Sequence, residues 1–599
     1  MAANKNVESR RLFPTSKPKV PQRTPLSILD ATVARFTPTG AVWVFDELPR
    51  DVTESAFLQT LEKSFIEALN EFPQWAGQLR WAEIRPGGDH TARFGRPLIE
   101  WGSDADTGVE WGVVRHPFRL EDIVPAASKR SAGPGVWRSD EFPQHAMISS
   151  TPLPLHNLVD YAGLPAMAAQ VNLFAEGGGY AIGVKMAHVV ADAQTLLLFM
   201  GVWAAKSRAL FSSSPGPSSG TDAEPSTKEK ASPVFDPAAL DARAAGDIDG
   251  PGPDPGLSAR ARTLPLHRHD WWDTEAPGFS PALVPGAEAS RPTPEQLPHA
   301  GAVAAAEAPE TRAPWHTWDL ARPNGHALLH FRAGELERMR SVARAEASSN
   351  VAGTNGYGSG HGDGNGGTVA IDVKISRLDA LLAHLFRTVN RARVSVHDYL
   401  LYSEEDSEVY LNVTLDARRR VDPPLPTTFV GSPLFLTHIK TRATSLVSSS
   451  GRPGTVGNGA LESGPGTLGE VARELRRTMQ LFTPDAVAAM LHDAAHEPSP
   501  QRLWQGFLGA RHLIVTSWLR LPLYNIDFVG AGGGEDGDAG SRRRVPRYVH
   551  PVMMPCDGII LVMDSPVEEG AVDVSLFLDR EVLQKLLTEE EAELRRFRG

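Results

Sequence analysis

The sequence predicts an α/β protein with two domains. Its 599 residues exceed what one hydrophobic core usually organises. Alternating apolar residues, typical of strands, and apolar residues at helical spacing occur both before residue 213 and after residue 310. Between them lies a segment rich in Pro, Ala, Gly and Ser. We therefore expect an N-terminal tail (1–24), a first domain (25–212), a crossover (213–312) and a second domain (313–599).

Composition excludes several classes of protein. The chain is 41% hydrophobic and 22% charged, as in globular proteins, and its net charge is −12 without a basic stripe. Nucleic acid is therefore not expected as a partner. The N-terminus has no apolar core of a secretory signal, and no run of 18 apolar residues predicts a membrane span. A lone cysteine, Cys556, excludes an internal disulfide, and we expect a cytoplasmic protein.

Four segments have too little apolar sequence to form a core of their own. The longest is 213–310, and three Gly-rich segments lie at 349–368, 447–468 and 530–545. The apolar surface that such a composition can bury is too small to offset the entropy lost when the chain is ordered. We expect a crossover and three flexible insertions within the second domain, and we expect the region around 524–550 to pack with the first domain.

Local patterns predict the ordered elements. A helical stripe from Leu58 to Phe72 ends at Pro73, and Ser376-Arg-Leu-Asp379 is a capping box that opens another helix. Strands are predicted at 410–415, 558–563 and 572–578, and a final acidic helix at 581–596.

One segment combines a strand, a histidine and a helix start. Residues 180–186 alternate as a strand does, and His188 falls on the same inward face. Apolar residues at helical spacing then predict a helix over about 193–210, with Asp192 as its N-cap. An imidazole at the mouth of a strand, beside a helix N-terminus, is well placed for proton transfer. A core histidine satisfied by hydrogen bonds would give the same pattern.

The spacing His-x-x-x-Asp occurs three times, so spacing alone does not choose His188. His156 lies in a polar turn between prolines, and His269 lies inside the low-complexity segment. Only His188 sits at a strand-to-helix junction. His492 and His496 are four residues apart on a predicted helix, but no third ligand accompanies them, so no metal site is expected.

Several blocks, in order, resemble the BAHD acyltransferases, most closely the fungal members that act in secondary metabolism. The blocks are Pro25 to Asp30, Leu61 to Leu79, His188-Val-Val-Ala-Asp192, Ser376 to Asp379 with Arg391-Ala-Arg393, Asp416-Ala-Arg418, Thr516-Ser-Trp518 and Tyr524 to Phe528. Two departures stand out. Ala193 replaces a frequent Gly after the motif Asp, and Asp527-Phe-Val-Gly530 lacks the second aromatic of the family's Asp-Phe-Gly-Trp-Gly element.

The resemblance implies a fold and roles for individual residues. It implies two similar-sized domains like chloramphenicol acetyltransferase, with a channel between them that reaches His188 from both ends. His188 would be the general base, without an acyl-enzyme. Asp192 would pair with an arginine of the 416–420 block, Arg418 before Arg420, unless that block is a solvated basic turn. Asp527 would support the structure, and Trp518 would line the channel or stabilise an oxyanion.

The expected activity is transfer of an acyl group, by default acetyl, from acyl-CoA to a hydroxyl of a small secondary metabolite, less often to an amine. Acyl-CoA would be a co-substrate, no cofactor would be tightly bound, and the protein would be a monomer. Two alternatives remain open. One is a condensation-type enzyme that uses a carrier-bound thioester, although Ala187 stands where those relatives usually have a second His. The other is a non-catalytic binding protein with the same fold.

Overall fold

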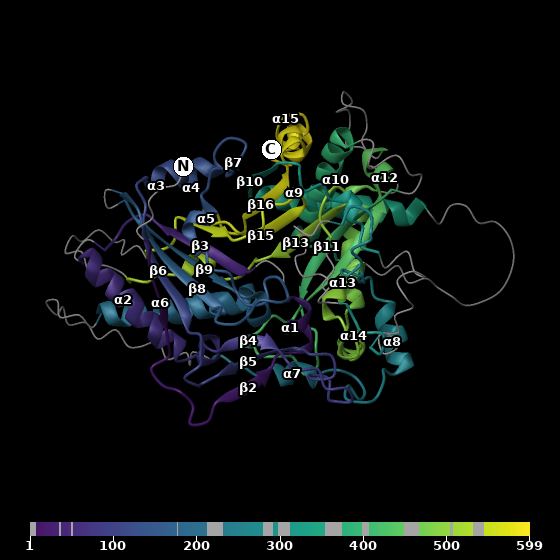
Figure 1. Cartoon of the computed structure of the whole chain (residues 1–599). Helices are drawn as coiled ribbons and strands as arrows, with labels where there is room; N and C mark the ends of the chain where they lie inside the picture. The colour runs from purple at the N-terminus through teal and green to yellow at the C-terminus, as the bar shows by residue number, and fades with distance from the viewer. Residues whose placement is uncertain are drawn as a thin grey trace.

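The computed structural model is an α/β protein with two domains. It describes residues 7–34, 38–49, 52–175, 178–212, 232–279, 291–296, 312–353, 374–397, 407–448, 466–503, 507–530 and 544–598. Within these ranges two large sheets and one small sheet are covered by helices, and each large sheet has its own hydrophobic core (Figure 1).

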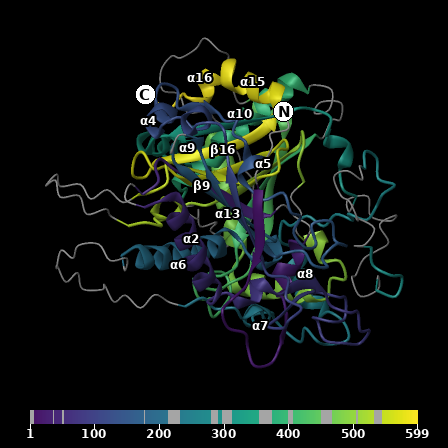
Figure 2. The same cartoon turned by 60° about the vertical axis from the view of Figure 1, so that its left-hand side comes forward.

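The first sheet belongs mainly to the N-terminal half. Its strand order is β1 (Val7–Leu12), β6 (Val109–Arg115), β8 (Met167–Leu173), β9 (Tyr180–Met186), β3 (Thr39–Phe45) and β14 (Tyr548–Pro551). Its strands β3, β8 and β9 are buried throughout. Helices α2 (Glu54–Leu69) and α6 (Ala193–Ser212) lie side by side against this sheet in both Figures 1 and 2. A small sheet joins β2 (Gln22–Pro25), β5 (Pro97–Trp101) and β4 (Gln78–Trp81).

The second sheet belongs mainly to the C-terminal half. Its strand order is β12 (Leu434–Arg442), β11 (Glu408–Asp416), β13 (His512–Ser517), β15 (Ile559–Asp564), β16 (Val572–Asp579), β10 (Asn324–Phe331) and β7 (Val136–Arg138). The neighbours β11 and β13, and β13 and β15, run parallel. The longer helices of this half are α9 (Ala333–Gly353), α10 (Arg377–Val396) and α13 (Leu468–Leu481), and the shorter helix α15 (Arg580–Thr588) follows β16. The predicted capping box from Ser376 to Asp379 opens α10, and both of its hydrogen bonds are present.

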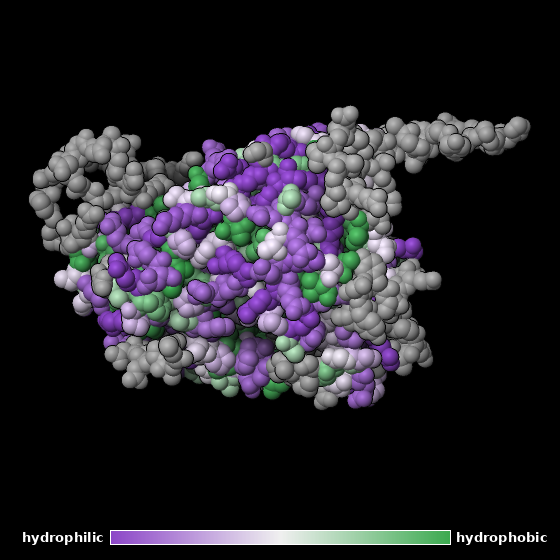
Figure 3. Space-filling view, turned by 90° about the horizontal axis from the view of Figure 1, so that it is seen from above, coloured by the Kyte–Doolittle hydropathy of each residue, from purple (hydrophilic) through white to green (hydrophobic). Residues whose placement is uncertain are grey.

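Shorter helices complete the fold. They are α1 (Ile28–Thr32), α3 (Leu120–Ile123), α4 (Ala127–Ser131), α5 (Gln144–Met147), α7 (Pro237–Asp241), α8 (Pro255–Arg262), α12 (Ala443–Ser448), α14 (Pro484–Ala495) and α16 (Glu591–Leu594), with 3₁₀ turns that include η1 (Pro73–Ala76), η3 (His188–Val190) and η9 (Pro500–Leu503). None of the helices in the described ranges is both long and apolar enough to cross a membrane. On the face shown in Figure 3, hydrophilic residues predominate and hydrophobic ones form small scattered groups.

The two halves exchange strands. β14, from the C-terminal half, pairs antiparallel with β3 and so becomes an edge of the first sheet. This pairing places part of the region around 524–550 against the first domain. In return β7, from the N-terminal half, pairs with β10 at the edge of the second sheet. The two domains are therefore tied together by backbone hydrogen bonds as well as by side-chain packing.

The prediction that residues 1–24 form a tail is wrong for two stretches. β1 pairs with β6 along its whole length, and β2 pairs with β5. These edge strands are held by backbone hydrogen bonds and are mostly exposed, so they carry no strong apolar alternation that a sequence could reveal.

The prediction that residues 213–310 form only a low-complexity crossover is wrong for 232–279. Leu240 of α7 is fully buried in the second core, and Trp271 packs against Trp315 with ring centroids 5.0 Å apart. A β-bridge also joins Val234 to Phe429. The segment folds because a few apolar residues dock on cores that other elements have already formed, and average composition hides such isolated contacts.

The C-terminal end also differs from the prediction. In place of one helix over 581–596, the structure has α15 followed by α16, with a break at Glu589 and Glu590. Of the predicted Gly-rich insertions, residues 354–373, 449–465 and 531–543 lie outside the described residues.

Candidate active site

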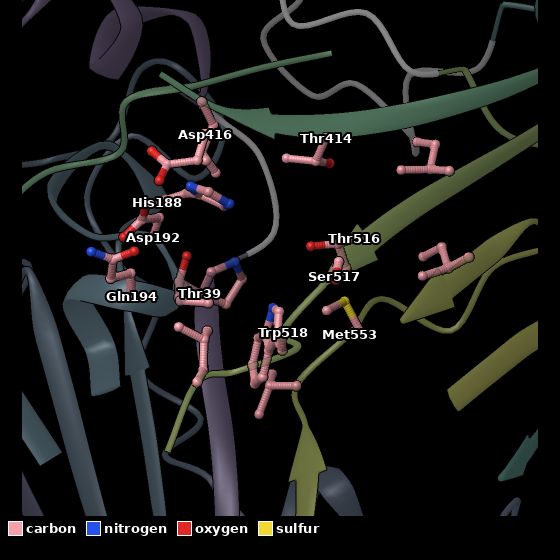
Figure 4. A pocket seen from close by; sticks show the side chains of 18 of the residues that line it. Thr39, His188, Asp192, Gln194, Thr414, Asp416, Thr516, Ser517, Trp518 and Met553 are labelled. Atoms are coloured by element: carbon pink, nitrogen blue, oxygen red, sulfur yellow. The ribbon is translucent and has the colours of Figure 1, made fainter. Parts of the chain in front are cut away.

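The candidate site forms where three strands end. His188 follows β9 and begins the turn η3 that leads to α6. Asp416 ends β11, and Ser517 ends the neighbouring strand β13, with Trp518 directly after it. Because β11 and β13 run parallel, their carboxyl ends lie at the same edge of the second sheet. That edge faces the His188 turn of the first domain (Figure 4).

A cavity of about 320 Å³ lies between these strand ends. The first domain contributes Thr39, His188, Asp192 and Gln194 to its wall, and the second domain contributes Thr414, Asp416, Thr516, Trp518 and Met553 among others. In Figure 4 the His188 ring and the Trp518 indole both project toward the open centre of the cavity. The cavity is thus shared by both domains.

A smaller cavity of about 160 Å³ also reaches His188. Its wall includes the segment 152–156, Lys185 and Val189, and it shares only Pro38 and His188 with the larger cavity. His188 is therefore open to two cavities with otherwise different walls. His156 lines the smaller cavity, but its Nδ1 lies 2.9 Å from the Leu153 carbonyl oxygen, which ties the ring to its own turn.

The Nδ1 atom of His188 contacts a loop of the second domain. This atom lies 2.9 Å from the hydroxyl oxygen of Ser432, which follows Gly431 in the loop before β12. Burial lowers the pKa of His188 below its ordinary value of 6.5, more strongly than its own backbone carbonyl and the nearby Asp192 raise it. The ring is therefore uncharged at neutral pH, as a proton acceptor must be.

Ser432 is in turn held by Asp30, which follows Leu29 in helix α1. The Ser432 backbone N–H donates to Asp30 Oδ1 at 2.5 Å. The other oxygen of Asp30 accepts from the Ser27 hydroxyl at 2.6 Å and from the Ser27 N–H at 3.0 Å. Burial raises the pKa of Asp30 to about 7. Sequence reasoning assigned no role to Asp30 or Ser432, although Ser27 and Asp30 have the same capping-box spacing as Ser376 and Asp379.

Asp192 points away from the larger cavity's centre and forms a two-pronged ion pair with Arg418. Arg418 Nη1 donates to Asp192 Oδ2 at 2.5 Å, and Nη2 donates to Oδ1 at 3.0 Å. Both side chains are buried. Asp192 Oδ1 also accepts from the Thr195 N–H at 2.9 Å, so it caps α6 as the sequence predicted. Arg420, the second candidate partner, instead donates to the Met479 carbonyl.

Asp416 and Trp518 lie on the wall of the larger cavity. Asp416 Oδ1 accepts from Arg418 Nη1 at 3.1 Å, and burial raises the pKa of Asp416 despite the opposing charge of Arg418. The Trp518 side chain is buried, and its backbone N–H donates to the Val562 carbonyl at 2.7 Å. That bond continues the pairing of β13 with β15 and fixes the backbone that carries the indole.

Asp527 lines neither cavity. Its Oδ1 accepts from the backbone N–H groups of Val529 at 3.0 Å and Gly530 at 2.9 Å, which closes a turn. Next to it, Phe528 packs edge-on against Trp203 of α6, with ring centroids 4.7 Å apart. These contacts stabilise the first core. In the order of the family's element, the missing second aromatic falls at Gly530, whose φ is +86°.

The remaining candidates belong to the core. His492 uses both ring nitrogens, one 2.8 Å from the Ala245 carbonyl and one accepting from the Asp254 N–H at 2.8 Å. In the parts of the chain that the structure describes, no three His, Cys, Asp or Glu side chains are grouped as metal ligands. Burial raises the pKa of the Cys556 thiol, so it stays protonated. His269 lines neither cavity; it is buried and stacks on His267.

Comparison with known proteins adds to this geometry. A model of the Transferase family matches residues 147–249 and 327–593. The acyltransferase AFT15-1 of Alternaria alternata is 23% identical over 95% of both chains, and the acyltransferase abl6 of Leptosphaeria maculans is 23% identical over 93% of this chain and 90% of its own. F. graminearum TRI101, solved with coenzyme A and deoxynivalenol, has a similar fold at a TM-score of 0.55 and 14% identity, covering 95% of this chain and 98% of that one.

The family model covers well over half of the chain, and it includes the strand β9, the His188 turn and the edge of the second sheet that together form the site. The chain therefore belongs to the Transferase family of BAHD acyltransferases, which use acyl-CoA as the donor.

Proposed function

We propose that this protein transfers an acyl group, by default acetyl, from acyl-CoA to a hydroxyl group of a small secondary metabolite, with His188 as the general base. One observation carries the proposal: an uncharged His188 is open to two cavities with different walls. Two substrates that approach from different sides would meet at this ring. An amine is the second class of acceptor, because it too loses a proton when it is acylated.

The reaction needs no acyl-enzyme. His188 Nε2 would accept the proton of the acceptor hydroxyl while its oxygen attacks the thioester carbonyl carbon. The C–O bond forms, and the carbonyl becomes a tetrahedral oxyanion. When the intermediate collapses, the C–S bond breaks and the protonated His188 returns the proton to the coenzyme A thiolate. General-base help of this kind contributes about 10²–10⁴ in rate.

Trp518 is the proposed donor to the oxyanion. Its indole lies across the larger cavity from His188, where the carbonyl oxygen would point during attack (Figure 4). Oxyanion donors act strongly because they are already in place and surrounded by little water. The Trp518 side chain is buried and its backbone is fixed by strand pairing, which supports this role.

A small-molecule acceptor fits the comparisons. The solved TRI101 structure contains coenzyme A together with deoxynivalenol, which is a small natural product. The two fungal relatives that cover nearly the whole chain are named only as acyltransferases, so they support the reaction class and leave the acceptor open.

The test is a donor and acceptor screen on the purified protein. Acetyl-, hexanoyl- and coumaroyl-CoA are each incubated with hydroxylated terpenoids, polyketides and phenols and with aliphatic amines. Free thiol and the acylated product are then measured. We expect acceptor-dependent thiol release for at least one hydroxylated acceptor. Release only from acyl groups on a carrier protein would favour the condensation-type alternative. Absence of release together with no thermal stabilisation by coenzyme A would favour the binding protein.

A further inference from the structure

We propose that Asp30 and Ser432 are positioning residues that orient His188 for proton transfer. They form a continuous chain, from the carboxylate of α1 through the Ser432 backbone N–H and hydroxyl to the His188 ring. This inference rests on the proposed function of His188 as a base. It adds two residues that do not touch substrate but act through the residue that does.

The contacts of His188 Nδ1 favour its protonation, because the histidine's own backbone carbonyl can only accept a hydrogen bond, whereas the Ser432 hydroxyl can donate or accept one. If Nδ1 carries the hydrogen, it can donate to Ser432 Oγ at 2.9 Å, and the histidine's own backbone carbonyl also accepts from the ring. The lone pair is then on Nε2. A base that accepts the substrate proton on Nε2 needs this tautomer. The backbone carbonyl therefore favours the reactive form of the ring, and Ser432 holds the ring's orientation.

Asp30 fixes the position of Ser432. The short hydrogen bond from the Ser432 N–H to Asp30 Oδ1 holds the loop at its C-terminal end. Gly431, with φ of +152°, passes so close that a Cβ there would lie 3.1 Å from Asp30 Oδ1. On the other side, the Gly431 carbonyl accepts from the Asp192 N–H at 3.1 Å and from the Thr195 hydroxyl at 2.9 Å. The loop is thus clamped between α1 and the start of α6.

Capping alone does not explain Asp30. The equivalent Asp379 in the capping box of α10 forms an ion pair with Arg476 at 2.6 Å, which offsets the cost of its burial. In the described part of the chain no cation pairs with Asp30, although it is 1% exposed. Burial of a carboxylate without a cation is costly and is typical of functional sites. Asp30 Oδ2 takes part in the helix cap with Ser27, while Oδ1 accepts the hydrogen bond from the Ser432 N–H.

The test is a double-mutant cycle on the full chain with Asp30→Ala and Ser432→Ala. Each single variant should lower kcat about tenfold, with KM for acyl-CoA changed less than about twofold, because the ring is misplaced while the binding walls remain. If Asp30 acts through Ser432, the kcat of the double variant should lie within about twofold of the kcat of the slower single variant. Ser432→Thr, which keeps the hydroxyl, should restore most of kcat.

Asp379→Ala is the matched control, because it removes a capping box that has no connection to His188. It should lower the unfolding temperature and leave kcat within about twofold. The proposal would be overturned if Asp379→Ala lost as much kcat as Asp30→Ala. It would also be overturned if the kcat losses of Asp30→Ala and Ser432→Ala multiplied in the double variant. If Asp30→Ala does not fold, the contrast between Ser432→Ala and Ser432→Thr still decides whether the hydroxyl matters.

A second readout does not require turnover. Diethylpyrocarbonate modifies unprotonated imidazole nitrogens, and its rate at the His188 peptide can be followed by mass spectrometry, with His156 as an internal reference. Ser432→Ala and Asp30→Ala should both slow modification of His188, and not additively. If the two variants show this non-additive slowing but the protein has no transferase activity, the positioning role stands and the proposed function fails. Turnover without coupling would reject the positioning role alone.

Discussion

Asp192 and Arg418 are 226 positions apart in the chain, yet their side chains form a buried two-pronged ion pair between the two domains. The pair anchors the turn that carries His188 to the loop that ends β11. Asp192 also caps α6, so one carboxylate holds three parts of the structure together. This arrangement explains how the His188 turn of the first domain is held next to the strand ends of the second domain.

Replacement of Arg418 by Met should lower the free energy of unfolding by about 3–5 kcal/mol, because it leaves Asp192 buried without its cation. Chemical denaturation measures this loss. The exposed neighbour provides the control, and Arg419→Met should change stability by less than about 0.5 kcal/mol. Similar stability of the two variants would show that the pair does not hold the turn.

Leu240→Ala should cost about 2–5 kcal/mol of stability, because it removes a fully buried side chain from the second core. Denaturation by urea reports the change. Val234→Ala in the same crossover should have a small effect, since Val234 is 37% exposed. A flexible crossover would tolerate both changes equally, and that result would contradict the packing of residues 232–279.

Trp518→Phe should lower kcat by about 10²–10³ with little change in KM, because it removes one donor to the oxyanion and keeps an aromatic ring in place. Steady-state kinetics with the acceptor found in the screen measures both constants. Trp203→Phe is the control. It removes an indole N–H that donates to the Leu61 carbonyl in the first core, and it should reduce stability without lowering kcat. An unchanged kcat in Trp518→Phe would leave the oxyanion donor unassigned.

The pH dependence of kcat/KM should show an acid limb below pH 6.5. The base must be unprotonated, and burial lowers the pKa of His188 below 6.5, so activity is full at neutral pH and is lost as the pH falls through that lowered pKa. Rates measured from pH 5 to pH 9 locate the limb. An acid limb centred above pH 7 would contradict an uncharged, buried His188.

Local sequence was sufficient to predict the parts of the site that local forces determine. The strand before His188, the capping Asp192 and the capping box of α10 follow from periodicity and from helix-end chemistry within a few residues. The pairing of Asp192 with Arg418 required the family resemblance, because no local pattern selects a partner so distant in the chain.

Other parts of the structure could not be predicted from composition or spacing. Asp30 and Ser432 are 402 positions apart, and each looks like an ordinary cap or loop residue until the fold brings them together. The crossover at 232–279 looked disordered on average, although Leu240 within it is fully buried against other elements. The edge strands β1 and β2 depend on backbone hydrogen bonds, which leave little trace in the sequence.

The central claim is that His188 is the base for acyl transfer. The most direct measurement compares acceptor-dependent release of coenzyme A by wild type, His188→Ala and the exposed-site control His145→Ala, at saturating substrates and with equal folded fractions. We predict that His188→Ala loses a factor of about 10²–10⁴ in kcat while His145→Ala matches wild type. Release by His188→Ala at the wild-type rate would contradict the account.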